Sequence, residues 1–331
     1  MPRTAFAALG VHVPDRVVTN EELTRRMETS DAWIQERTGI RERHWVREGT
    51  ENSDLALEAT KKALDRAGWK PSDIEAIVYA SLSPDHMFPG DGAFLNAKLG
   101  LPGVPAIDIR NQCSGFIYGL AVADAWIRIG MYRRVLLVGS EVHSTGLDVS
   151  TRGRDVSVIF GDGAGAALLE ATDDPGRGVL SCHLHADGRG AKDLFVDAPG
   201  SKYHPRVQAR MLEDASIYPV MDGQKVFKHA VSKMPGVVRE ALEANGLTPH
   251  DLKVLIPHQA NLRISQMVQR ALELGDEQVF NNIQKYGNTT AASIPIALAE
   301  AVEERGVKRG DLVGLCAFGA GFTWASALVR W

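Results

Sequence analysis

Hydrophobic and polar positions along the chain follow two periods, one typical of strands and the other typical of helices. Short apolar or alternating runs predict strands at residues 4–11, 74–80, 106–109 and 135–139. Apolar positions three and four residues apart predict helices at residues 21–27, 30–39, 53–68 and 93–99. Asn20 is the predicted cap of the first helix, and Gly39 and Gly68 are placed to end two others. Strands that alternate with helices in this way indicate an α/β protein.

The same order of predicted elements occurs twice along the chain. Residues 63–78 align without gaps on residues 241–256, with Ala, Leu, Gly, Pro and Asp at matching places. A second pair, residues 120–138 and 296–314, matches in nearly the same register. Two matches in register indicate a tandem duplication of an α/β unit. We therefore expect two halves, residues 1–171 and 172–331, joined near residues 171–178.

Cys113 occupies the most informative position of the first half. A predicted strand at residues 106–109 leads into a sharp turn at residues 111–114, and a helix begins near Gly115. Unpaired N–H groups and the macrodipole favour negative charge at a helix N-terminus. This setting predicts a lowered thiol pKa and a thiolate that attacks acyl groups.

Candidate partners for Cys113 lie at the ends of strands in the second half. His258 follows the predicted strand at residues 254–256, and Asn288 lies in the turn before the helix that matches the helix after Cys113. The last strand runs into a glycine-rich turn at Gly319–Gly321. Ligands of paired α/β halves gather outside the carboxyl ends of the strands. We therefore expect His258, Asn288 and this turn to converge on Cys113.

Composition narrows the classes of function. The 331 residues carry a net charge of −4, which argues against a general nucleic-acid binder. Three cysteines without a CxxC motif provide neither a disulfide framework nor a zinc site, so a reducing compartment is expected. No signal-peptide pattern is present, and no apolar run approaches the roughly 20 residues that span a membrane. The expected location is the cytoplasm, away from membranes.

Four motifs carry a resemblance to a known family. They are Cys113, Pro257-His-Gln-Ala-Asn-Leu-Arg263, Gly287-Asn-Thr289 and Phe318-Gly-Ala-Gly-Phe-Thr-Trp324. In this order they resemble the motifs of the β-ketoacyl-ACP synthase III family in the thiolase superfamily, and the likeness runs from Gly10 to Trp331. It implies a five-layered αβαβα fold built from the two duplicated halves, and a homodimer.

The resemblance also implies an activity. Members of this family perform a decarboxylative Claisen condensation of an acyl-CoA with malonyl-ACP, as at the initiation of fatty-acid biosynthesis. The products are 3-ketoacyl-ACP, CO2 and CoA, and the acyl group passes through a thioester on the residue that matches Cys113. Acyl-CoA and malonyl-ACP are substrates, and no metal or redox cofactor is required.

Roles for single residues follow from the matching motifs. Cys113 matches the nucleophile, and its N–H and that of Ala320 resemble the family's acyl oxyanion hole. His258 and Asn288 look like the pair that binds the malonyl thioester oxygen, for which His258 should be neutral. Phe318 resembles the aromatic residue beside the departing carboxylate, where an apolar wall disfavours charge.

Contacts with the carriers are also implied by the resemblance. Trp33 and Arg154 match the residues that sandwich the CoA adenine, and Arg37 matches one that meets the CoA phosphates. A planar guanidinium and an indole suit stacking on a base. Three further residues match family positions that form a basic rim for the acidic acyl carrier protein: Lys228, Arg263 and Arg270.

Acyl specificity is the property that the resemblance leaves open. Phe88 matches the position whose side chain crosses the dimer interface to close the partner's acyl pocket, although packing inside its own subunit remains an alternative. Gln112 and Ser114 flank Cys113 where the family commonly has small apolar residues. The polar, irregular segment 187–218 is longer than in compact members, and we expect it to run over the surface.

Several other functions fit part of the pattern. A carrier-dependent acyltransferase or condensing enzyme of a secondary-metabolite pathway uses the same fold and the same Cys–His pair. Head-to-head condensation of two acyl chains needs a Glu in the loop 84–89, where only Asp85 lies. A papain-like hydrolase shares the order Cys, His, Asn but not the local signature. A biosynthetic thiolase needs a second catalytic Cys, and Cys316 lies two residues ahead of the matching place. A binding module would have lost Cys113 or His258.

Overall fold

Two β-sheets organise the fold, and each sheet is made from one half of the sequence. The computed structural model describes residues 1–331. The first sheet has five strands in the order β1 (Arg3–His12), β7 (Gly163–Thr172), β6 (Arg134–Glu141), β4 (Ala76–Ala80) and β5 (Ala106–Ile109). The second has four strands in the order β11 (Leu252–Pro257), β12 (Leu312–Gly319), β13 (Thr323–Arg330) and β8 (Gly178–Ala186).

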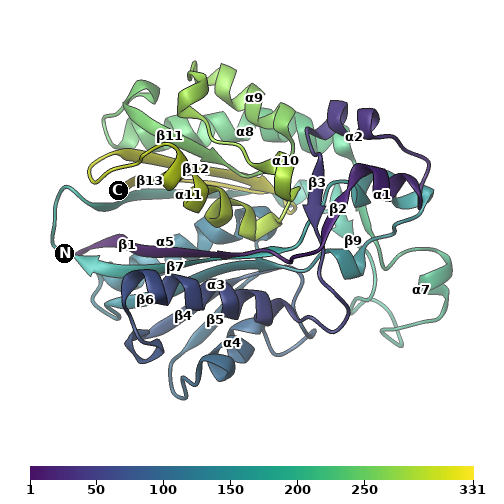
Figure 1. The fold of residues 1–331 in the computed structure, drawn as a ribbon, viewed down its shortest axis with the longest axis horizontal. Helices are drawn as coiled ribbons and strands as arrows, with labels where there is room; N and C mark the ends of the chain where they lie inside the picture. Colours follow the sequence, from purple (N-terminus) through teal and green to yellow (C-terminus); the bar gives the residue numbers. More distant parts are fainter.

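Helices form three layers around the two sheets (Figure 1). The outer layers are α3 (Asn52–Ala67) with α4 (Asp91–Leu99) on the first sheet, and α8 (Gly223–Ala244) with α9 (Leu262–Ala271) on the second. Between the sheets lie α5 (Gly115–Arg128) and α11 (Ser293–Glu304). The remaining helices are short: α1 (Asn20–Thr24), α2 (Asp31–Thr38), α6 (Arg154–Ser157), α7 (Arg210–Glu213) and α10 (Ile283–Tyr286). The predicted αβαβα order is therefore confirmed.

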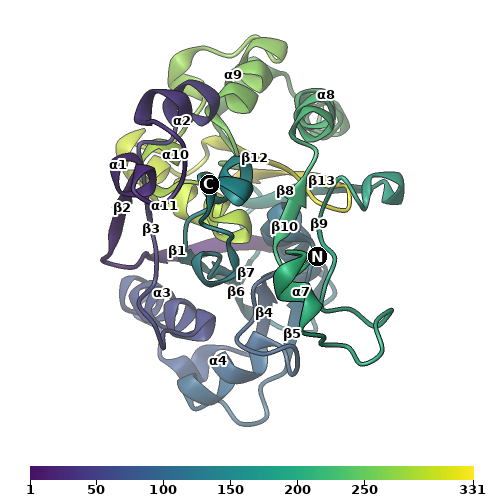
Figure 2. The same ribbon diagram turned by 90° about the vertical axis from the view of Figure 1, so that its right-hand side faces the viewer.

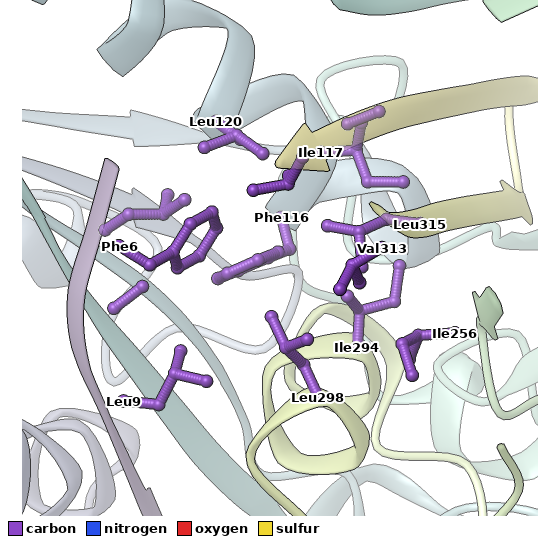
Figure 3. Packing of buried hydrophobic residues seen from close by; sticks show 14 of the residues in the cluster. Phe6, Leu9, Phe116, Ile117, Leu120, Ile256, Ile294, Leu298, Val313 and Leu315 are labelled. Atoms are coloured by element: carbon purple, nitrogen blue, oxygen red, sulfur yellow. The ribbon is translucent and has the colours of Figure 1, made fainter. Parts of the chain in front are cut away.

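The layer between the sheets holds the largest hydrophobic cluster (Figure 3). Its side chains come from both sheets and from α5 and α11, and include Phe6, Leu9, Phe116, Ile117, Leu120, Ile256, Ile294, Leu298, Val313 and Leu315. Both central helices are apolar on more than one face because each contacts both sheets. This packing fixes the N-terminus of α5, where Cys113 lies.

The duplicated segments fold in the same way. Each repeat runs from a long helix through a one-turn 3-10 helix that begins with Pro71 or Pro249, and continues into a parallel strand, β4 or β11. In the second repeat pair, α5 leads to β6 and α11 leads to β12. The carboxyl ends of the equivalent strands therefore meet at one end of the molecule.

Several short elements lie at that same end. The strands β2 (Val17–Thr19) and β3 (Glu42–His44) pair with each other, as do β9 (Leu194–Val196) and β10 (Pro219–Met221). Figure 2 looks onto this end, with α1 and α2 on one side and β9, β10 and α7 on the other. The expectation that residues 187–218 run irregularly over the surface was wrong in part, because β9 and α7 form within them.

Helix ends agree with the sequence at most positions. Gly39 and Gly68 have φ of 80° and 66°, the left-handed conformation in which a helix commonly ends on glycine. The predicted cap Asn20 is wrong, because Thr19 accepts the hydrogen bond from the Glu22 N–H and caps α1. Asn20 is instead buried and donates to Asp31 and to the Ile40 carbonyl.

Candidate active site

Cys113 lies in the 3-10 turn η2 (Gln112–Ser114), between the edge strand β5 and the N-terminus of α5. The residue is 7% exposed. The end of β12 packs directly against it, since a Cβ on Gly319 would lie 2.8 Å from the Cys113 Cβ and 3.2 Å from its sulfur. Only glycine leaves room for this contact, so the turn Gly319–Gly321 meets Cys113 as the sequence predicts.

The thiol is protonated in the resting site. Burial, with a smaller contribution from the charge of Glu141, raises the pKa of Cys113 to about 12. The predicted lowering of this pKa was therefore wrong. The backbone N–H groups of Cys113 and Ala320 and the Thr290 hydroxyl favour the thiolate, but desolvation is the larger effect. Both N–H groups face the sulfur, where they could bind the oxygen of a thioester.

His258 is held from its backbone and from one ring nitrogen. Its N–H donates to the Cys316 carbonyl at 2.7 Å, and Nδ1 lies 2.6 Å from Ser293 Oγ. Ser293 also accepts from the Gln259 N–H at 3.4 Å, so its own proton is available to Nδ1. Burial, helped by His143, lowers the pKa of His258 to about 3. The ring is therefore neutral, and its proton belongs on Nε2, which is buried without a partner.

Asn288 is held at the junction of the two halves. Its backbone pairs with Ile159 and Gly161, and its side-chain oxygen accepts from the Thr290 N–H at 2.8 Å. This bond fixes the orientation of the amide and leaves the NH2 group as a donor. Asn288 is connected to Cys113 through Thr290, whose hydroxyl bonds the thiol.

Phe318 forms part of an aromatic cluster beside Gly319, the glycine that packs against Cys113. It lies on β12 next to Gly319, is buried, and its ring centroid is 4.9 Å from that of Phe322. His229 adds a third ring, 5.1 Å from Phe322. The cluster is apolar on the side of Phe318, as its sequence-based role requires.

A cavity of about 770 Å³ reaches Cys113. Met87, Gln112, His143, Thr290 and Ala320 belong to its wall, whereas His258, Asn288 and Phe318 do not and stay buried behind it. The segment expected on the surface supplies much of the opposite wall, through Ala191, Leu194, Phe195, Val196, Ala198, Pro199 and Ile217. Asn288 is thus connected to Cys113 through Thr290, and none of the three second-half residues lines the cavity itself.

The residues that match CoA contacts lie together. The guanidinium of Arg37 is 4.6 Å from the Trp33 ring centroid, and that of Arg154 is 4.5 Å from the same ring. Arg154 is held there by a bond to the Glu28 carbonyl. The three side chains thus form one cluster in which two guanidinium groups contact the indole ring.

Lys228, Arg263 and Arg270 lie exposed on the packed pair α8 and α9. None of them makes an ion pair, whereas their neighbour Lys225 binds both Asp193 and Asp222. Arg263 lies 5.8 Å from the ring of Phe227. These three cations are therefore available to an acidic surface.

Phe88 points into solvent. Its side chain is 81% exposed, so the alternative that it packs internally was wrong. The adjacent Met87 is exposed and lines the cavity of Cys113. Asp85 in the same loop bonds the N–H and hydroxyl of Ser53 at the start of α3, which occupies its carboxylate.

Sequence reasoning missed three site residues: Glu141, His143 and Thr290. Glu141 is the last residue of β6 and His143 comes two residues later, so the rule about carboxyl ends of strands would have found them. Thr290 lies two residues beyond Asn288, in the turn already singled out. Separately, none of the helices is long and apolar enough to cross a membrane.

A buried thiol between backbone donors, at the meeting point of two duplicated α/β halves, defines a thiolase-like acyl-transferring enzyme. Sequence comparisons assign the family. The model of the family described as 3-oxoacyl-[acyl-carrier-protein (ACP)] synthase III matches residues 107–188, and that of its C-terminal part matches residues 242–331. The chain belongs to the β-ketoacyl-ACP synthase III family and is a condensing acyltransferase.

Individual relatives are similar to this chain along nearly their whole length. A β-ketoacyl-[acyl-carrier-protein] synthase III of Rhodospirillum centenum is 46% identical over 332 residues, covering 99% of each chain. The crystal structure of 3-oxoacyl-[acyl-carrier-protein] synthase III from Aquifex aeolicus is similar with a TM-score of 0.91 and 40% identity, over 99% of this chain and 100% of that one. The Thermus thermophilus structure matches equally well, with a TM-score of 0.91, 40% identity and 99% of each chain covered.

Proposed function

We propose that the residues around Cys113 carry out a decarboxylative condensation of an acyl-CoA with malonyl-ACP in two half-reactions. The observation that carries this proposal is the set of donors around one buried thiol. Two backbone N–H groups face the sulfur, and the unpartnered Nε2 of His258 belongs to a buried ring close enough to His143 to feel its charge, while His143 bonds the Thr290 hydroxyl that bonds the thiol. Two separate sets of donors are what two successive oxyanions need.

In the first half-reaction Cys113 takes the acyl group from CoA. Its sulfur attacks the thioester carbonyl, and the developing oxyanion is bound by the N–H groups of Cys113 and Ala320. The bond to the CoA sulfur then breaks, and CoA leaves as a thiol with the proton that Cys113 gives up. Because burial raises the thiol pKa to about 12, that proton must be transferred as the new bond forms.

In the second half-reaction malonyl-ACP loses CO2. Electrons of the breaking carbon–carbon bond move into an enolate, whose oxygen accepts from His258 Nε2–H and from the Asn288 NH2. The burial that lowers the pKa of His258 to about 3 keeps it neutral, so it donates a hydrogen bond without giving up a proton. The apolar wall at Phe318 disfavours the carboxylate. The enolate carbon attacks the acyl thioester, releasing 3-ketoacyl-ACP and the Cys113 thiolate; these steps require no metal or redox cofactor.

The carriers and the assembly belong to the same proposal. CoA is held by Trp33, Arg37 and Arg154, and the acyl carrier protein binds the basic surface of Lys228, Arg263 and Arg270. The molecule is a homodimer, as the exposed Phe88 supports. Two duplicated halves meet near residues 171 and 172, and three free cysteines fit a cytoplasmic location.

Asn288→Ala tests the separation of the two half-reactions. The rate at which acyl-CoA loads Cys113 is expected to stay near that of the wild type. Mass spectrometry of the intact protein measures this rate. Release of CO2 from labelled malonyl-ACP is expected to fall about 10²-fold or more, as when an oxyanion donor is removed. The matched control Asn282→Ala removes a buried asparagine that bonds Glu300 instead, and should change neither rate more than a few-fold. Equal loss of both steps in Asn288→Ala would assign that residue a structural role.

A further inference from the structure

His143 is a buried histidine on the wall of the Cys113 cavity with no part in the reaction described above. It follows β6 and is 8% exposed. Its ring centroid is 4.6 Å from that of Phe160, and its backbone N–H donates to Asp162 at 2.7 Å. The ring is therefore fixed from two sides, and it faces the space that an acyl group on Cys113 would enter.

One ring nitrogen of His143 is already used. Nε2 lies 2.7 Å from Thr290 Oγ1, and the same hydroxyl bonds the Cys113 thiol. Thr290 has a φ of 47°, which is rare for a β-branched residue and persists only where the surroundings impose it. Two hydrogen bonds in series place Nε2 within roughly 6 Å of the sulfur.

The direction of these bonds decides which ring nitrogen carries the proton. While the thiol keeps its proton there is no thiolate for the Thr290 hydroxyl to stabilise, and we assign the hydroxyl proton to the bond with His143 Nε2. Burial lowers the pKa of His143 to about 3, so the ring is neutral and has a single N–H, which is then at Nδ1. Nδ1 has no hydrogen-bond partner within the chain and lies at the cavity wall, so an acyl group that displaces water from this wall has to supply its acceptor.

We propose that His143 selects an acyl group that carries an uncharged acceptor oxygen, a hydroxyl or keto group near its third carbon. An oxygen at that place lies a few bonds beyond the thioester, within reach of Nδ1. Gln112, next to Cys113, adds a second polar side chain without a partner in the chain, whereas the opposite wall is apolar through Leu194 and Phe195. The cavity thus suits a polar group beside the thioester followed by hydrocarbon.

Charge excludes an acidic acyl group. Glu141 is buried close enough to Cys113 to raise the pKa of its thiol, so a carboxylate beside the thioester would be repelled. Arg110, the cation on the cavity wall, is exposed and donates to the Leu82 carbonyl. The selected oxygen is therefore that of an alcohol or ketone.

The test compares CoA esters of equal chain length. This test rests on the proposed loading of Cys113 from acyl-CoA. Mass spectrometry of the intact protein gives the kcat/KM of loading for butyryl-CoA, 3-hydroxybutyryl-CoA and succinyl-CoA. Wild-type protein should load the 3-hydroxy ester about tenfold better than butyryl-CoA, the effect of satisfying one buried donor. His143→Leu, of similar volume and apolar, should reverse this preference, and His143→Gln, which retains a donor, should restore part of it.

Thr145→Val is the matched control, because Thr145 lines the same cavity but is exposed; it should leave the ratio unchanged. A wild-type ratio near one, or an unchanged ratio in a folded His143→Leu, would overturn the selection by His143. A preference for succinyl-CoA would overturn it too and assign selection to Arg110. If wild-type protein takes up none of the three acyl groups, the proposed function itself fails.

Discussion

At the scale of single residues, the site keeps its nucleophile neutral until the substrate is bound. The Cys113 thiol has its pKa raised to about 12, and the His258 and His143 rings have theirs lowered to about 3. Burial is the main cause in all three cases, because it disfavours whichever form is charged. An uncharged thiol and uncharged rings hold an apolar acyl chain at little desolvation cost, and the donors around them stabilise charge where oxyanions form.

Glu141 gives a direct test of this electrostatic setting. Burial raises its own pKa to about 7, so above that pH its charge opposes formation of the Cys113 thiolate. Glu141→Gln should lower the thiol pKa and increase the rate of iodoacetamide modification of Cys113 at pH 9 by roughly tenfold, one pKa unit. The rate should still rise with pH in both proteins.

Asp124→Asn is the control for that measurement. Asp124 is a buried carboxylate on α5 whose charge affects Cys182 but not Cys113. Its substitution should leave the modification rate of Cys113 unchanged. The folded protein is modified first, and the label on the Cys113 peptide is then counted after digestion. A slower reaction in Glu141→Gln than in wild type would contradict the assigned effect of the Glu141 charge.

The residue scale also marks where sequence reasoning ends. The place of Cys113 could be predicted because a strand, a turn and a helix follow one another within a few residues. The pKa of Cys113 could not be predicted, because its desolvation comes from β12 and from η8 (Thr290–Ala292), which lie about two hundred residues away in the chain. His143 escaped notice because a lone histidine after a strand acquires meaning only beside Thr290.

At the scale of elements, α8 and α9 present the surface that we assign to the acyl carrier protein. Arg263→Glu should raise the KM for malonyl-ACP about tenfold, with a penalty that shrinks at high salt, because the contact is between exposed charges. The KM for acyl-CoA should stay unchanged. Steady-state assays with each substrate varied in turn provide the measurement.

Lys225→Glu is the control on the same surface. Lys225 is already paired with Asp193 and Asp222, so it offers less free charge to a partner. Its reversal should raise the KM for malonyl-ACP less than Arg263→Glu does. An equal rise for acyl-CoA in Arg263→Glu would show that Arg263 does not contact the carrier protein.

The segment 187–218 shows what the sequence could not predict about elements. Its many Pro, Gly and charged residues indicate a loop, and most of it is irregular. Its few apolar side chains, among them Leu194, Phe195 and Ile217, nevertheless face the Cys113 cavity. Periodicity carries no information in such a segment, so its inward face was visible only in the fold.

At the scale of the whole molecule, the duplication predicted two α/β halves, and the family resemblance implied the five-layered order. The two sheets are separated by the central helices α5 and α11, as that order requires. The sequence could not show which edge of a sheet stays free. That edge is β5, whose side chains are mostly half-buried. The turn that carries Cys113 follows this strand directly in the chain.

Phe88 tests the proposed dimer. If it closes the acyl pocket of the partner subunit, Phe88→Ala should shift loading toward longer acyl-CoAs, each further buried CH2 contributing up to about 0.8 kcal/mol. Loading rates across acyl-CoAs of increasing length provide the measurement. Ile129→Ala, which trims another exposed apolar side chain far from the loop, should leave the profile unchanged. A fully active monomer would contradict the role of Phe88 in the partner.

The central claim is that Cys113 carries the acyl group between the two carriers. Intact-protein mass after incubation with acyl-CoA, and again after addition of malonyl-ACP, tests it most directly. Wild-type protein and Cys316→Ala should gain one acyl group, mapped to the Cys113 peptide, and lose it as 3-ketoacyl-ACP forms. Cys113→Ala should gain none. An acyl group that still loads on Cys113→Ala, or one that malonyl-ACP does not discharge from wild type, would contradict the account.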